Sequence, residues 1–221
     1  MKRVMIDPGH GPGNVNKGPT GYYEYKGMWT LSNYLKAELE KRGVAVGLTR
    51  TETEDPELDS RGLKATGYDL FISEHSNAYG TSGVRGVEVF HSLRRTDMAN
   101  AGKLSAAIAK CMNTPNRGAK TRSYTRDSTT DWYGIVRNAA RTNVKHIFLC
   151  ESGFHTSRED EAWLKKDSNL KLLAKAQSDV ICDILGVGII DPQPEPKPDP
   201  VPDETMATLK LIYELLRTIF E

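Results

Sequence analysis

The sequence predicts an α/β fold in which helices cover the faces of a sheet. Short runs of β-branched and other apolar residues alternate with longer stretches whose apolar residues recur every three or four positions. This alternation is typical of strands joined by amphipathic helices. The chain has 221 residues, of which 38% are hydrophobic and 27% charged, as in ordinary globular proteins. That length suffices for one α/β domain and a small appendage.

The expected elements follow one another along the first 185 residues. Strand Arg3–Asp7 comes first, and helix Trp29–Arg42 follows with Gly43 as its C-terminal cap. The other predicted elements are strand Val44–Thr49, helix Leu58–Thr66, strands Asp69–Ser73 and Gly86–His91, helix Thr96–Met112, strand Lys145–Cys150 and helix Ser168–Leu185.

A proline-rich segment marks a domain boundary. Six prolines occupy every second position from Pro192 to Pro202, and such a run favours extended polyproline II over helix or sheet. We therefore expect a folded domain over residues 1–190, a linker over 191–204 and an amphipathic helix over 205–221. The broad apolar face of that helix predicts a partner: a second copy of the chain (a homo-oligomer), the folded domain, or a missing module.

Composition and segment lengths exclude several classes of protein. The formal net charge is +1, whereas nucleic-acid-binding domains usually carry a strong basic excess. No apolar stretch reaches the roughly 18 residues that span a bilayer, and nothing before the first strand resembles a signal peptide. We therefore expect synthesis in a cytoplasm, no nucleic-acid partner and no membrane span. The three cysteines, without CxxC spacing, predict neither a disulfide framework nor a thiolate metal site.

Two of the five histidines follow predicted strands, His10 after the first and His75 after the third. Ligands of open α/β sheets gather beyond the carboxyl ends of strands, so these imidazoles can converge. Glu24, in a polar loop before the first predicted helix, is the best third ligand, because two imidazoles and a carboxylate hold zinc in several hydrolases. A lone histidine at a strand end is more often structural, so the pattern alone leaves both interpretations open.

Glu151 follows the last predicted strand. A carboxylate there could take a proton from water and pass it to a leaving amine, provided that it lies within hydrogen-bond reach of both groups. A zinc ion would activate the water and polarise an amide carbonyl. A purely structural zinc site is disfavoured, because such sites usually have four ligands rich in cysteine.

At these residues the chain resembles the amidase-3 family of zinc N-acetylmuramoyl-L-alanine amidases, over residues 1–187. The segments Ile6–Gly11 and Phe71–Ala78 resemble the two histidine motifs of the family, and Leu149–Phe154 resembles the segment with the catalytic glutamate. Glu24 falls where the family has a ligand glutamate before the first helix. Several ordered motifs over one whole domain make this resemblance specific.

The resemblance implies a twisted mixed, mostly parallel sheet flanked by helices on both faces, and hydrolysis of the amide between the lactyl group of N-acetylmuramic acid and L-alanine in bacterial peptidoglycan. It implies one zinc ion held by His10, Glu24 and His75, with Glu151 as the catalytic residue. Arg137 and Asn77 are predicted to contact substrate. The expected setting is a phage or prophage endolysin released through a holin pore, or else a sporulation lysin freed by mother-cell lysis.

Some segments depart from the family pattern. Glu74 and Ser76 flank His75 where an apolar residue and alanine are usual. We expect Glu74 to point to the opposite face of its strand from His75. The segment Ser123–Trp132 is polar and aromatic, and both a loop lining a glycan groove and an ordinary surface loop fit it. Alternative functions are a zinc peptidase acting on stem peptides and an inactive wall-binding module.

Overall fold

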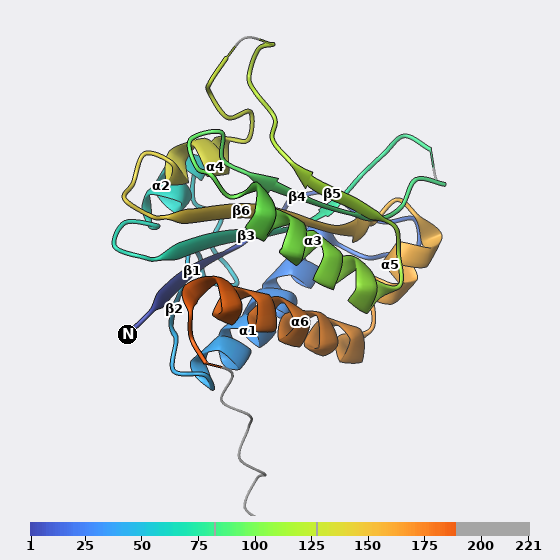
Figure 1. Ribbon diagram of the computed structural model, residues 1–221. Coiled ribbons are helices and arrows are strands. Elements are labelled where there is room, and N and C mark those ends of the chain that lie inside the picture. The colour runs from blue at the N-terminus through green and yellow to red at the C-terminus, as the bar shows by residue number, and fades with distance from the viewer. Residues whose placement is uncertain (82, 127, 189–221) are drawn as a thin grey trace, which may run out of the picture. The chain divides into compact units, whose positions relative to one another are not determined.

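A six-stranded mixed sheet forms the centre of the protein in the computed structural model (Figure 1), which describes residues 1–81, 83–126 and 128–188. The strand order is β2-β1-β3-β6-β4-β5. The strands are β1 Arg3–Pro8, β2 Ala45–Leu48, β3 Leu70–Asn77, β4 Val87–His91, β5 Asn116–Lys120 and β6 His146–Phe154. All neighbouring pairs are parallel except β4 with β6. The predicted mixed, mostly parallel sheet is therefore confirmed.

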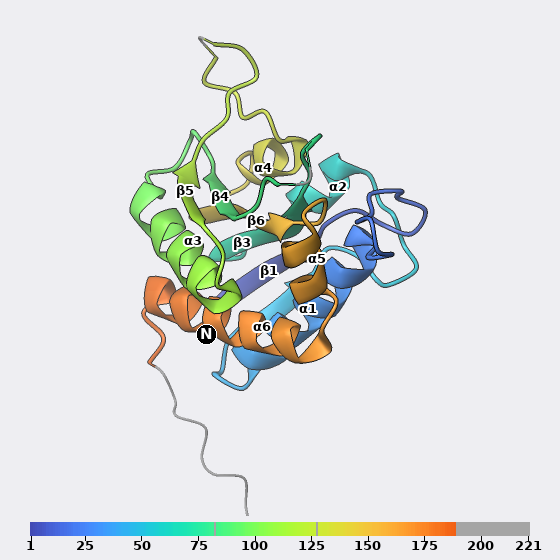
Figure 2. The same ribbon diagram turned by 90° about the vertical axis from the view of Figure 1, so that its right-hand side faces the viewer.

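Helices cover both faces of this sheet. The helices are α1 Glu24–Glu40, α2 Leu58–Leu63, α3 Met98–Met112, α4 Gly134–Ala139, α5 Arg158–Leu164 and α6 Asp167–Leu185. Figures 1 and 2 show α1, α3 and α6 together on one face and α2 and α4 on the other. None of the described helices is long and apolar enough to cross a membrane.

Each face of the sheet packs into its own apolar core. On the α1–α3–α6 face, Ile72 and Phe148 of the sheet pack with Leu31, Leu104 and Leu173 of the helices, and all five are fully buried. The opposite core contains Phe71, Ile135 and Ile147. Alternate residues of β3 thus serve opposite cores, as the two-residue period of a strand requires.

Several element boundaries differ from the prediction. Helix α1 begins at Glu24 instead of Trp29, so Glu24 is a helical residue and not part of a preceding loop. Strands β3 and β6 run on through His75 and Glu151, which the sequence placed after the strands. The sequence did not predict β5, α4 or α5. The predicted linker 191–204 and helix 205–221 lie outside the described residues.

Candidate active site and metal centre

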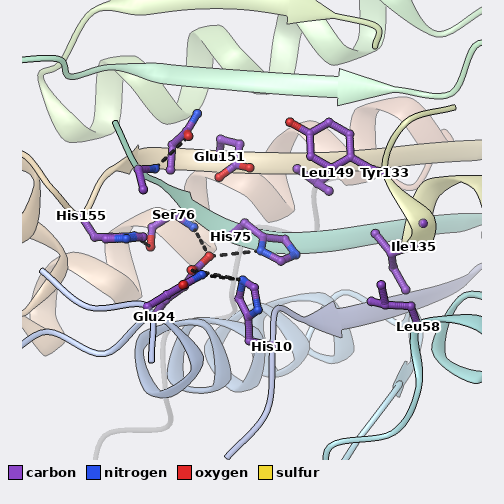
Figure 3. Close-up of a pocket in the computed structure, with 14 residues that line it drawn as sticks. His10, Glu24, Leu58, His75, Ser76, Tyr133, Ile135, Leu149, Glu151 and His155 are labelled. Atoms are coloured by element: carbon purple, nitrogen blue, oxygen red, sulfur yellow. Dashed lines mark hydrogen bonds and ion pairs between the residues drawn. The ribbon is translucent and has the colours of Figure 1, made fainter. Parts of the chain in front are cut away.

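A pocket of about 370 Å³ lies where β1, β3 and β6 end, and it is lined by His10, Glu24, His75, Asn77 and Glu151 of the predicted site residues. Figure 3 shows Glu24, His10 and His75 close together, with Glu151 on the strand beside His75. Leu58, Tyr133 and Ile135 form one end of the pocket, and Ser76 and His155 form the other. The pocket thus has an apolar end, a polar end and a centre of ionisable groups.

Three side chains meet at this centre. One potential ligand atom each from His10, Glu24 and His75 lies within 4.8 Å of the others. The Glu24 carboxylate contacts both imidazoles, with Oε2 3.2 Å from Nε2 of His10 and Oε1 3.1 Å from Nδ1 of His75. Among the described residues, this is the one group of three or more such side chains with metal-binding spacing.

The local backbone explains this convergence. Strands β1 and β3 are parallel neighbours, so their carboxyl ends lie together. Gly9 allows the close approach, because a Cβ there would lie 2.3 Å from the Glu74 carbonyl oxygen and 2.6 Å from the His75 ring. His10 adopts a left-handed conformation with φ of 57°, which is uncommon for a residue other than glycine. It turns the chain out of β1 while keeping the imidazole beside Glu24.

The electrostatics of Glu24 fit a cation site. Burial raises the pKa of a carboxyl, but here the hydrogen bonds and charges of His10 and His75 outweigh burial and hold the pKa of Glu24 well below its ordinary value. An ionised carboxylate thus lies buried between two imidazoles. Two imidazoles and one carboxylate form a donor set that holds catalytic zinc and leaves a position open for water or substrate. The three residues therefore fit a zinc ion.

Glu151 lies on β6, between His75 of the candidate metal centre and a second acidic residue, Glu88. It is paired in the sheet with His75 on one side and with Glu88 on the other. Burial, with the nearby charges of Glu24 and Glu88, raises the pKa of Glu151 well above its ordinary value. A carboxyl group with a raised pKa inside a pocket is suited to proton transfer near neutral pH.

Three polar residues that the sequence did not identify as site residues support Glu24. Asn16 donates its side-chain N–H to Glu24 Oε2 at 2.9 Å, and the backbone N–H of Ser76 donates to Oε1 at 3.0 Å. The Ser76 hydroxyl lies 3.0 Å from Nδ1 of His155. Burial lowers the pKa of the His155 imidazole. The signals in the sequence were the polar loop after His10, the position of Ser76 next to His75, and the short distance in sequence from Glu151 to His155.

The two predicted substrate contacts lie in different surroundings. Asn77 lines the pocket, and its side-chain N–H lies 3.4 Å from Oε2 of Glu88. The Arg137 guanidinium instead donates from Nη1 to the carbonyl oxygens of Asp131 and Trp132, at 2.8 and 3.1 Å. Arg137 is therefore held at the base of the neighbouring loop, and it is not among the residues that line the pocket.

Glu74 points away from this pocket, as predicted. Its carboxylate is buried against helix α6, where Nε2 of Gln177 lies 3.0 and 2.9 Å from its two oxygens. Cys111, Cys150 and Cys182 are all free thiols, of which Cys150 and Cys182 are buried.

Comparison with known proteins identifies relatives of this chain. A sequence model of the N-acetylmuramoyl-L-alanine amidase family (Amidase_3) matches residues 4–183. The "Probable cell wall amidase LytH" of Staphylococcus aureus is 29% identical over 185 residues. The match covers 80% of this chain and 56% of that protein, so the chain spans little more than half of this relative.

Solved structures share the fold. The catalytic domain of CwlV, an N-acetylmuramoyl-L-alanine amidase from Bacillus (Paenibacillus) polymyxa var. colistinus, is 25% identical with a TM-score of 0.72, and the match covers 85% of this chain and all of that domain. Cwp6 from Clostridium difficile is 27% identical with a TM-score of 0.73, over 82% of this chain and 29% of Cwp6.

Proposed function

The chain belongs to the N-acetylmuramoyl-L-alanine amidase family (Amidase_3), and from this premise we propose that it hydrolyses the amide between the lactyl group of N-acetylmuramic acid and L-alanine in bacterial peptidoglycan, with zinc as its cofactor. One observation carries the proposal: His10, Glu24 and His75 converge within 4.8 Å beside a buried Glu151. Family membership alone gives the reaction class, whereas this cluster gives the chain a means of performing it.

His10, Glu24 and His75 are the residues that would hold the zinc ion. When bound, zinc supplies the Lewis acidity that activates water and polarises the amide carbonyl. Asn16 and Ser76 hold the two carboxylate oxygens of Glu24 through N–H donors, which fixes the orientation of this ligand. Hydrogen-bonded neighbours of this kind commonly tune metal affinity.

Glu151 is the proposed general base and general acid. Its carboxylate takes a proton from the attacking water and returns one to the nitrogen of the departing L-alanine, so that the amine leaves neutral. The burial that raises its pKa also favours holding the proton between these two steps. The scissile amide lies between two groups that each carry a methyl, lactyl and L-alanyl, and the apolar end formed by Leu58, Tyr133 and Ile135 suits such a group.

The proposed place of action is the bacterial cell wall. The role of a phage or prophage endolysin released through a holin pore, or of a sporulation lysin, remains a prediction from the sequence. So does homo-oligomer formation through residues 205–221. Sedimentation of the full chain and of residues 1–190 tests the second prediction. A multiple of the monomer mass for the full chain, with a monomer mass for residues 1–190, would support it.

Digestion of purified peptidoglycan tests the proposed reaction. We expect new amino termini on L-alanine without new reducing sugar ends, loss of activity on chelation and recovery on addition of zinc. A zinc peptidase would instead expose amino termini of other residues or release single amino acids. Zinc binding or wall binding without any bond cleavage would indicate an inactive wall-binding module.

A further inference from the structure

An aromatic hairpin stands beside the pocket. Residues 122–126 and 128–132 pair through a bridge between Ser123 and Asp131, with backbone hydrogen bonds from Tyr124 N–H to Thr130 and from Trp132 N–H to Arg122. Figure 1 shows this segment projecting from the body between β5 and α4. We define these residues as the aromatic hairpin.

The hairpin is firmly held at its base. Asp131 is buried and accepts hydrogen bonds from the Ser92 hydroxyl and the Leu93 N–H, both at 2.8 Å. The Arg137 guanidinium binds the two carbonyl oxygens described above. The base is therefore held by the segment that directly follows β4 and by helix α4.

Large aromatic side chains remain exposed above this base. Tyr124 and Trp132 are 60% and 43% exposed, and their ring centroids lie 5.6 Å apart. The Arg122 guanidinium lies 4.5 Å from the Trp132 ring centre, and that of Arg137 lies 6.0 Å from the Tyr124 ring centre. Such aromatic and cationic groups at a surface mark interaction sites more often than a scattered apolar residue does.

The hairpin is continuous with the wall of the pocket. Tyr133, the residue after Trp132, lines the pocket and lies 4.8 Å from the Phe90 ring, while Arg122 is 5.9 Å from the Tyr133 ring. Arg122 thus contacts the ring of Trp132 in the hairpin and the ring of Tyr133 in the pocket wall, which connects the two surfaces.

The chemistry of these groups fits a sugar strand. Pyranose rings present C–H faces that pack on aromatic rings and hydroxyl edges that accept hydrogen bonds from guanidinium groups. Each completed cleavage of the proposed reaction also leaves a lactyl carboxylate on the glycan, and arginine binds carboxylates well. A stem peptide is only a few residues long, whereas the glycan continues beyond the pocket on both sides of the reacting muramoyl unit.

We infer that the aromatic hairpin binds the glycan strand of peptidoglycan, with Trp132 and Tyr124 as the packing surface and Arg122 as the polar contact. This inference rests on the proposed function, because it assigns one part of the proposed substrate to a surface beside the same site.

Binding and turnover on two substrates test this inference. The variants Trp132→Ala and Tyr124→Ala, in the full zinc-loaded chain, are compared with wild type and with Leu172→Ala, an exposed apolar residue of α6. We expect the Kd for peptide-free glycan strands to rise at least fivefold in both hairpin variants and to stay unchanged in Leu172→Ala. The ratio of kcat/KM on whole walls to kcat/KM on a soluble muramoyl-dipeptide should fall to a similar degree.

Three results would overturn the inference that the hairpin binds glycan. They are no binding of peptide-free glycan by wild type, unchanged affinity for glycan in both variants, or inhibition of wall binding by free stem peptide but not by free glycan. Chemical denaturation of each variant identifies a loss due to unfolding, and Trp132→Phe, which keeps an aromatic ring, should restore most of the affinity. If the protein binds glycan through the hairpin but cleaves no amide, the proposed function is contradicted and this inference stands.

Discussion

The hydroxyl of Ser76 lies 3.0 Å from Nδ1 of His155, and both residues lie next to the proposed metal ligand Glu24. The same serine donates its backbone N–H to Glu24 Oε1 at 3.0 Å. His155 is itself tied to β3, because its backbone N–H donates to the carbonyl oxygen of Asn77 at 2.8 Å. The pair therefore connects the end of β6 to a carboxylate that begins helix α1.

This relationship predicts that His155→Leu weakens zinc binding. Without the imidazole, the Ser76 hydroxyl keeps only its longer contact of 3.5 Å to the Tyr22 hydroxyl, so the backbone that holds Glu24 becomes less constrained. We expect the zinc Kd, measured by competition with a chelator, to rise about tenfold, the lower end of what such supporting residues contribute.

Two comparisons make the His155 test specific. His146→Ala alters a histidine at the opposite end of β6 that contacts Asp97, and it should leave the zinc Kd unchanged. Ser76→Ala should raise the Kd by a similar factor to His155→Leu, and the double variant should be no worse than either single one. Fully additive effects would contradict a shared pathway through this hydrogen bond.

A buried ion pair should contribute strongly to stability. Asp7 on β1 binds Arg61 of α2 through two hydrogen bonds of 2.8 and 2.9 Å, and it also accepts the hydroxyls of Thr49 and Ser73. Replacing Arg61 with Met leaves a buried carboxylate without its counter-charge. We expect the free energy of unfolding to fall by about 3–5 kcal/mol, measured by urea denaturation at neutral pH.

An exposed ion pair provides the control for Arg61→Met. Lys103 and Asp183 join α3 to α6 at 2.7 Å, but both side chains are more than half exposed. Lys103→Met should change the free energy of unfolding by less than about 1 kcal/mol. Equal losses in the two variants would show that burial does not set the contribution of the Asp7–Arg61 pair.

Glu74 should make stability depend on pH. Burial raises its pKa from 4.5 to about 7. Below pH 4.5 the group is neutral in both folded and unfolded chains and costs nothing. As the pH rises from 4.5 to 7, the carboxyl group loses its proton in the unfolded chain but keeps it in the folded chain. The free energy of unfolding therefore falls by up to about 3 kcal/mol, and this loss is complete above pH 7.

The variant Glu74→Gln tests this titration. The variant keeps the size of the side chain but cannot ionise. The difference between its free energy of unfolding and that of wild type should therefore shift by about 2–3 kcal/mol in favour of the variant from pH 5 to pH 8. Denaturation of both proteins in the presence of chelator keeps metal binding out of the comparison. A difference that stays the same at the two pH values would mean that Glu74 does not titrate in this range.

The sequence predicted the sheet and the chemical groups better than the boundaries near the site. Helix α1 begins at Glu24 and contains Gly27, which disfavours helix in an isolated peptide. The structure needs glycine there, because a Cβ would lie 2.4 Å from the Tyr22 ring. Residue propensities do not report such a contact between side chain and backbone, so the sequence pattern placed the start of this helix too late and left Glu24 in a loop.

Edge strand β5 was missed for a related reason. Its residues Asn116–Lys120 include no β-branched or aromatic side chain, so the strand has little intrinsic preference for sheet. Arg117 and Lys120 instead contact buried Glu88 on the neighbouring strand, at 2.5 and 2.7 Å. The carboxylate that these two residues hold lies next to Glu151 in the sheet.

Glu151 carries both proton transfers of the proposed reaction, and removal of its charge tests that role. Wild type and Glu151→Gln are loaded with zinc, their bound zinc is quantified, and both are given purified peptidoglycan. We expect equal zinc content in the two proteins, with release of L-alanine amino termini at least 100-fold slower in the variant, within the range that acid–base groups contribute. Release at the wild-type rate by a zinc-loaded Glu151→Gln would contradict this role.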